Sequence, residues 1–130
     1  MMNFNPDSQT QQTLDLLHQV LHHTVALEHL LRQPTPINYL LKERELETSQ
    51  YKLSTLLSQY QFDTKEQHLL FKLSLIKQEI QLLCMQRLVV DKEDKQYEDI
   101  NDKVMDLVHQ AQTLTKKLIK FNLNRVYGKY

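Results

Sequence analysis

The stretch that decides the fold lies in the second half of the chain and reads YEDINDKVMDLVHQAQTLTKKLIKF from residue 97 to residue 121. Its apolar residues recur in alternating steps of three and four, at Tyr97, Ile100, Val104, Leu107, Ala111, Leu114, Leu118 and Phe121. This spacing places one apolar stripe along a helix and is typical of a coiled-coil-like seam. The sequence therefore predicts a long helix that packs against a partner helix.

The partner helix is predicted directly upstream, where the same rhythm occurs. The apolar positions there are Leu69, Leu73, Ile76, Ile80 and Leu83. Asp63 and Glu66 resemble a capping box, in which Asp63 caps the helix and Glu66 reaches back toward it. The acidic residues 91–94 form a second helix-start signal. Because the link around residues 88–91 is short, the two helices are expected to be antiparallel neighbours.

Two further helices are predicted in the first half of the chain. The first opens near Asp7 or Ser8 and ends near Arg32, because the residue before a proline avoids the α region. The apolar face of this helix is expected to hold Leu14, Leu17, Leu21, Val25, Leu27, Leu30 and Leu31. The second begins at Pro36 with Thr35 as its N-cap. It carries Ile37, Leu40, Leu41, Leu46, Leu53, Leu56, Leu57 and Tyr60, and a continuous solvated helix across residues 42–52 is favoured over a kink.

The predicted fold class is all-α: an antiparallel helical bundle of about four helices, with a long coiled-coil-like hairpin of helices three and four. We expect a disordered N-terminal tail at residues 1–7, a single bundle domain at 8–121, and a basic and aromatic C-terminal tail at 122–130. One glycine and three prolines are too few turn formers for an all-β fold. They also exclude glycine-rich phosphate loops.

Charge and targeting signals favour a cytoplasmic protein. The formal net charge is zero, which gives no overall attraction to nucleic acid or to an anionic membrane. Residues 1–12 have no signal-peptide pattern, and no run of about 18 apolar residues could span a membrane. The single cysteine, Cys84, cannot form an internal disulfide and is interpreted as a buried structural residue.

Histidines are the first candidates for chemistry. His18 and His22 are spaced to share a metal ion, but the stretch between them lacks the glutamate of a zincin motif. The Glu-x-x-His pairs of carboxylate-bridged di-iron bundles do not occur either. A polar helix face is therefore favoured over incidental metal binding. The sequence predicts a protein that is not an enzyme and has no cofactor and no metal site.

The C-terminal residues are the predicted partner-binding surface. They interleave bases with apolar and aromatic side chains: Lys116, Lys117, Lys120, Leu123, Arg125, Val126, Tyr127 and Tyr130. The upstream helix is too short to cover the last of them. Self-association, docking of a protein partner and a weak RNA contact are expected in that order, because RNA-binding proteins usually carry a basic excess. The alternative is that these residues are simply the last turns of the bundle.

The order of features resembles the YlbF/YmcA family of small bacterial helical proteins across residues 14–121. The segments that carry the resemblance are Ala26-Leu27 to Leu31, Ile37-Asn38-Tyr39, Leu46, Leu69 to Leu83, and Asp94-Lys95-Gln96-Tyr97-Glu98-Asp99-Ile100. The family's Gln-x-x-Gly link is replaced here by QRLVV at residues 86–90. The resemblance implies a non-enzymatic regulator that forms homo- or hetero-oligomers. It also implies a role in competence, sporulation or biofilm control, and in RNA turnover through an RNase partner.

Three functions remain open from the sequence. The favoured one is an adaptor or regulatory protein that binds protein partners as a homo- or hetero-oligomer. The second is an export chaperone of the flagellar or type III kind, which would hold a partner helix in an apolar groove. The third and least favoured is a metal-using helical-bundle enzyme, which would need the histidines to face inward together with carboxylates.

Overall fold

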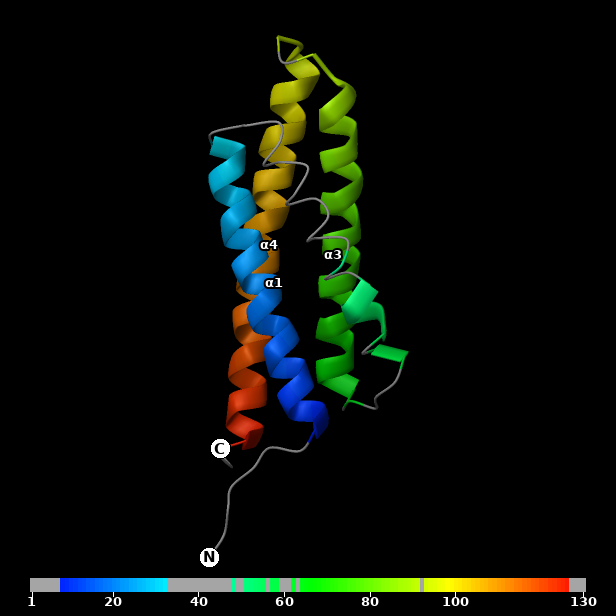
Figure 1. The fold of residues 1–130 in the computed structure, drawn as a ribbon, viewed down its shortest axis with the longest axis vertical. Coiled ribbons are helices and arrows are strands. Elements are labelled where there is room, and N and C mark those ends of the chain that lie inside the picture. The colour runs from blue at the N-terminus through cyan, green and yellow to red at the C-terminus, as the bar shows by residue number, and fades with distance from the viewer. Residues whose placement is uncertain are drawn as a thin grey trace, which may run out of the picture.

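The computed structural model describes residues 8–32, 48, 51–55, 57–58, 62, 64–91 and 93–126. Its long helices are α1 (Ser8–Arg32), α3 (Thr64–Val89) and α4 (Lys95–Val126), shown in Figure 1. Residues 48, 51–55 and 57–58 are helical as well. The predicted all-α antiparallel bundle is confirmed.

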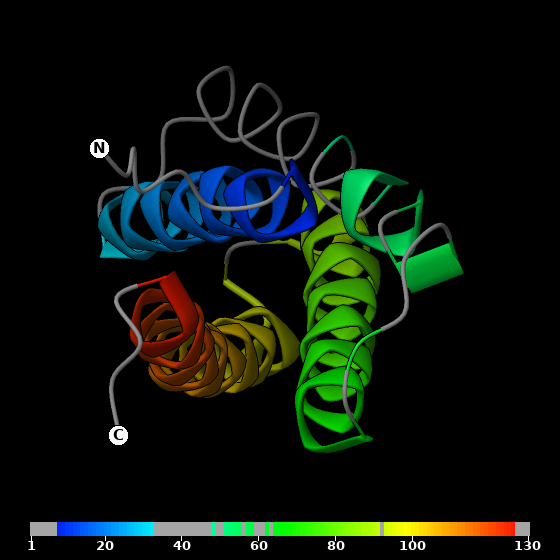
Figure 2. The same cartoon turned by 90° about the horizontal axis from the view of Figure 1, so that it is seen from below.

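Helix α4 is the helix on which the other two long helices pack. It runs antiparallel to both α1 and α3, and these lie on two adjacent sides of it (Figure 2). At about 1.5 Å per residue, the 32 residues of α4 extend over about 48 Å. The predicted long antiparallel hairpin of α3 and α4 is therefore confirmed.

The start of α4 is fixed by two aspartates. The Asp94 carboxylate accepts a hydrogen bond from the Gln96 backbone N–H at 2.9 Å, which is the geometry of an N-cap. Asp91 accepts one from the Glu93 backbone N–H at 3.1 Å, and the Asp94 N–H donates to the Asp91 carbonyl at 3.0 Å. These contacts close the tight link after α3 and confirm the predicted helix start.

The seam between α3 and α4 is apolar, as the sequence predicts. Its buried side chains from α3 are Leu73, Ile76, Ile80 and Leu83, and those from α4 include Ile100, Val104, Leu107, Ala111 and Leu114. Phe121, at the end of the predicted stripe, is only half-buried. Two polar pairs bracket the seam, Glu66 with Asn122 and Arg87 with Asn101. Residues 66 and 87 are 21 positions apart, as are 101 and 122, so the helices keep one register over three heptads.

The buried face of α1 agrees with the predicted one at Leu14, Leu17, Leu27 and Leu31 and differs from it elsewhere. Val25, predicted on the apolar face, is 41% exposed, whereas Leu16 and Val20 are buried. The side chain of Leu30 is outside the described ones. Of the nine buried positions among the described side chains of α1, seven repeat in steps of three and four: Thr10, Thr13, Leu17, Val20, Thr24, Leu27 and Leu31. The other two are Leu14 and Leu16.

Threonines fit this apolar row because their hydroxyls bond within the helix. Thr13 donates to the Gln9 carbonyl at 2.7 Å, and Thr24 donates to the Leu21 carbonyl at 2.8 Å. Each hydroxyl is therefore satisfied without water, which removes most of the cost of burying it.

Most predictions about the second helix and the N-terminal tail fall on residues outside the described ranges. These include the N-cap at Thr35, the continuity of the helix across residues 42–52, and the side chains of Ile37, Leu40, Leu41, Leu46, Leu56 and Tyr60. Leu53 is buried, and Leu57 packs half-buried against the core, as predicted. Within the described part of the chain, no helix is both long enough and apolar enough to cross a membrane.

Candidate functional site: the outer row of α3

Helix α3 carries a second row of apolar side chains that the core does not use. Phe71, Leu75, Leu82, Met85 and Val89 are each between 49% and 85% exposed. Together with the exposed Gln78, they recur in alternating steps of four and three. We call these six residues the outer row.

The outer row lies opposite the seam with α4. At 100° per residue, its mean direction differs by about 160° from that of Leu69, Leu73, Ile76, Ile80 and Leu83. From Phe71 to Val89 it extends for about 27 Å at 1.5 Å per residue. Single exposed apolar residues are ordinary, but a contiguous stripe of this length marks an interaction site. Helix α3 thus carries apolar side chains on two opposite faces, a pattern typical of helices that are covered on both sides.

The flanks of the outer row are mostly uncharged. Gln67, Ser74 and Gln81 follow one side, and His68, Lys72, Glu79 and Gln86 follow the other. Among these described flanking residues, Lys72 and Glu79 carry the full charges, and both are exposed. A low density of charge beside an apolar stripe is typical of the centre of a protein–protein interface.

A hollow opens at the N-terminal end of the outer row. It has a volume of about 330 Å³ and is lined by Leu57, Thr64, Gln67, His68 and Phe71. Phe71 belongs both to the hollow and to the outer row, so the two form one continuous surface.

The predicted C-terminal surface is only partly assembled among the described residues. Lys116, Lys117 and Lys120 are exposed on α4, and Leu123 is 37% exposed. Val126 is the last residue of α4. The side chains of Val126, Tyr127 and Tyr130 are outside the described ones, so the joint apolar and basic patch stays a prediction.

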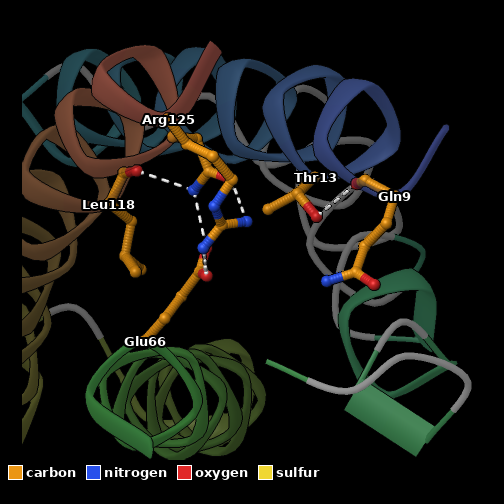
Figure 3. A network of polar contacts seen from close by, with 6 residues as sticks. Gln9, Thr13, Glu66, Leu118 and Arg125 are labelled. Carbon is orange, nitrogen blue, oxygen red and sulfur yellow. Dashed lines mark hydrogen bonds and ion pairs between the residues drawn. The ribbon is translucent and has the colours of Figure 1, made fainter. Parts of the chain in front are cut away.

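Arg125 belongs to a polar network that ties the end of α4 to the start of α3 (Figure 3). Its guanidinium donates to the carboxylate of Glu66, whose side chain is fully buried. Asn122 donates to the other oxygen of Glu66 at 2.8 Å and to the Leu118 carbonyl at 2.9 Å. Its own oxygen accepts from Arg125 at 3.5 Å. The capping role predicted for Glu66 involves Asp63, which is outside the described residues.

Helix α4 continues past the expected start of the C-terminal tail. Asn122 is fully buried, and α4 continues to Val126, whereas the tail was expected to begin at residue 122. A signal for the buried Asn122 exists in the sequence, because Val104, Val108, Ala111, Thr115, Leu118 and Asn122 form a second row in steps of four and three. The predicted boundary follows only the first row, which ends at Phe121.

The histidines of α1 do not converge. His18 and His22 lie on the exposed side of the helix, and the His18 Nδ1 atom is 2.8 Å from the Leu14 carbonyl oxygen. The described residues contain no group of three or more His, Cys, Asp or Glu side chains placed to hold a metal ion. Cys84 is buried in the core, as predicted.

Glu28 forms a polar clamp between α1 and α4 that sequence reasoning missed. Gln112 donates to its carboxylate at 3.0 Å, Arg32 donates at 3.0 Å, and the His109 Nε2 atom lies at 3.5 Å. These contacts, that of Gln112 above all, lower the pKa of Glu28 to about 2. The carboxylate is therefore ionised over the whole physiological range.

Lys77 is the second feature that sequence reasoning missed. It shares a buried face of α3 with Glu66 and Cys84, and its side chain is 1% exposed. Its Nζ atom has no hydrogen-bond partner among the described residues. Burial lowers the pKa of Lys77 to about 8. Nothing in its local sequence marks it, because an isolated lysine in a helix is ordinarily exposed.

No protein-family model, curated protein or solved structure matches this chain, so the outer row of α3 is interpreted from its own geometry.

Proposed function

We propose that this protein is a non-enzymatic adaptor or regulatory protein that acts by direct contact with protein partners, through the outer row of α3. The observation that carries the proposal is the exposed apolar row itself, which repeats at the spacing by which helices pack on one another. The continuous hollow and the weakly charged flanks support the same use.

The free energy of burying the outer row indicates how much further contact a partner must make. Burying one such side chain completely contributes about 1.5–3 kcal/mol, so the exposed parts of the five apolar residues offer roughly 5–9 kcal/mol together. Association costs about 4–15 kcal/mol in lost freedom of motion. The outer row is therefore the centre of an interface rather than all of it. The partner must also cover the flanks, toward the roughly 800 Å² per side of a stable complex.

The resemblance to the YlbF/YmcA family supports the same class of function. Under that resemblance, the contacts serve a regulatory assembly in the cytoplasm that acts in competence, sporulation or biofilm control. An RNase partner in RNA turnover belongs to the same proposal. In this account the protein itself carries no catalytic residue and requires no cofactor.

The test compares two exposed apolar residues, one inside the outer row and one outside it. Leu82→Glu places a charge in the row, whereas Val25→Glu places the same charge on the exposed side of α1. Both variants should fold with the helicity of the wild type, since both sites face solvent. Complexes captured from the native cells are identified by mass spectrometry and rebuilt from purified components, and self-association is measured in parallel by light scattering.

We expect Leu82→Glu to weaken the assembly, whether it forms with another protein or between copies, and Val25→Glu to leave it intact. Assemblies of equal strength for Leu82→Glu and the wild type would show that the outer row is not the contact surface.

A further inference from the structure

We infer that the partner of the outer row is a second copy of this chain, docked through its own outer row in the antiparallel direction. This inference rests on the proposed function, because it names the occupant of the same surface. Two features of α3 support it: the charges beside the row, and the hollow at its N-terminal end.

A second copy has the right shape for this surface. The outer row repeats in steps of four and three, so a helix that covers it must present the same repeat to interlock with it. The outer row of another copy is such a helix face. A twofold arrangement also closes on itself, because each copy offers the same patch and leaves none of the outer row over for a third copy.

The flanking charges select one alignment of the two rows. Lys72 and Glu79 lie on the same flank of α3, seven residues apart. If Phe71 meets the partner's Leu82 in an antiparallel pair, Lys72 faces the partner's Glu79. The twofold axis then repeats this pair, so both charges of each copy are matched.

The other alignments lack this match. An antiparallel shift of one heptad brings Lys72 beside the partner's Lys72, and the opposite shift brings Glu79 beside the partner's Glu79. A parallel pair places Lys72 beside the partner's Gln67 and Glu79 beside the partner's Ser74. Like charges across a helix pair are unfavourable, and a charge opposite a neutral group gains little. The charges therefore favour the antiparallel register with Phe71 opposite Leu82.

The hollow offers space for the two apolar residues that have no partner in the other outer row in this register. Met85 and Val89 then extend past Phe71 of the other copy, opposite His68 and Thr64. Both of these residues line the hollow of about 330 Å³, together with Leu57. A methionine adapts readily to an irregular apolar space. The register that pairs the charges thus also covers all five apolar residues of the outer row.

The first experiment tests the charges in the full chain by analytical ultracentrifugation. We expect a dimer that Lys72→Glu or Glu79→Lys alone weakens roughly tenfold, because each single change turns two attractive pairs into two repulsive ones. The double variant K72E/E79K restores the pairs with the charges exchanged, and its dimer should return to the strength of the wild type.

The second experiment tests the register by cross-linking. Leu75 lies opposite the partner's Gln78 in the proposed register, so a mixture of Leu75→Cys and Gln78→Cys chains should form a disulfide-linked dimer on oxidation. A mixture of Gln78→Cys and Leu82→Cys chains is the matched control. It should cross-link only if the helices are shifted by one heptad.

Three results would overturn the inference. A chain that stays monomeric at tens of micromolar, while Leu82→Glu abolishes binding of a different protein, would reject the second copy and leave the proposed function standing. A dimer that the charge exchange does not rescue, or that cross-links in the control pair, would reject the register. A dimer insensitive to Leu82→Glu as well would contradict both proposals.

Discussion

Replacing Lys77 by methionine should stabilise the protein, because the change removes a charged group from the buried face of α3. The Lys77 side chain is 1% exposed, and burial lowers the pKa of its ammonium from the ordinary 10.5 to about 8. At ~1.4 kcal/mol per pKa unit, this difference corresponds to about 3 kcal/mol of stability lost near pH 7. Methionine keeps the length and the unbranched shape of the side chain without the charge.

The pH dependence of the free energy of unfolding distinguishes the cost of burying the Lys77 charge from a simple gain in packing. Between the folded and the unfolded pKa, the unfolded chain binds one proton more than the folded one, so stability rises with pH. The advantage of Lys77→Met should therefore shrink from about 3 kcal/mol near pH 7 to roughly 1 kcal/mol near pH 9.5.

The assay is urea unfolding followed by circular dichroism at both pH values. Lys103→Met, at an exposed position of α4 away from the outer row, is the control and should change the free energy of unfolding by less than about 0.5 kcal/mol. A gain for Lys77→Met that is equal at the two pH values would refute ionisation as the cause. A loss of stability would show that the ammonium has a favourable role in the fold.

The remaining predictions concern the seam and the two polar clamps. Ile80→Ala and Leu107→Ala should each lower the free energy of unfolding by about 2–5 kcal/mol in urea titrations, and changes below about 0.5 kcal/mol at both would place the seam elsewhere. Because the pKa of Glu28 is lowered to about 2, its contribution to stability is present above its ordinary pKa near 4.5 and is lost as pH falls toward 2. Thermal melts of Glu28→Gln should accordingly show a smaller loss of stability over that acid range than the wild type, and parallel curves would count against the clamp. Deleting residues 127–130 should leave the melting temperature nearly unchanged, whereas deleting residues 122–130 should lower it markedly, because the longer deletion leaves the buried Glu66 without Asn122 and Arg125. Equal melting temperatures for the two deletions would show that the network adds nothing to stability.

The seam between α3 and α4 could be predicted because purely apolar residues mark its period. The seam of α1 could not be read in the same way, since three of its positions are threonines. The hydroxyls of two of these, Thr13 and Thr24, bond to carbonyls of the same helix, so a polar residue type occupies a buried position there.

The outer row shows a different limit of sequence reasoning. Helix α3 holds two rows with the same seven-residue period, one through Leu73 and Ile80 and one through Leu75 and Leu82. Periodicity correctly predicted the row through Leu73 in the seam, but it does not show that the row through Leu75 stays exposed. Nor does it show polar partners far apart in the sequence, such as Arg125, which contacts Glu66 from 59 residues away. The polar partners and the free apolar face therefore emerge only from the folded chain.

Two helices with a heptad repeat can shift against each other by seven residues and still pack apolar side chains on apolar side chains. The Glu66–Asn122 and Arg87–Asn101 pairs prevent this in the α3–α4 hairpin, because a slip of seven residues separates both pairs. A slip in one direction sets Asn122 against Leu73, and a slip in the other sets Asn101 against Ile80, while the second amide passes beyond the end of α3. These two pairs fix the register at both ends of the hairpin, and they couple the lengths of the two helices. The hairpin can gain or lose a heptad only if α3 and α4 change together, so lengthening one helix alone would break the alignment at one end.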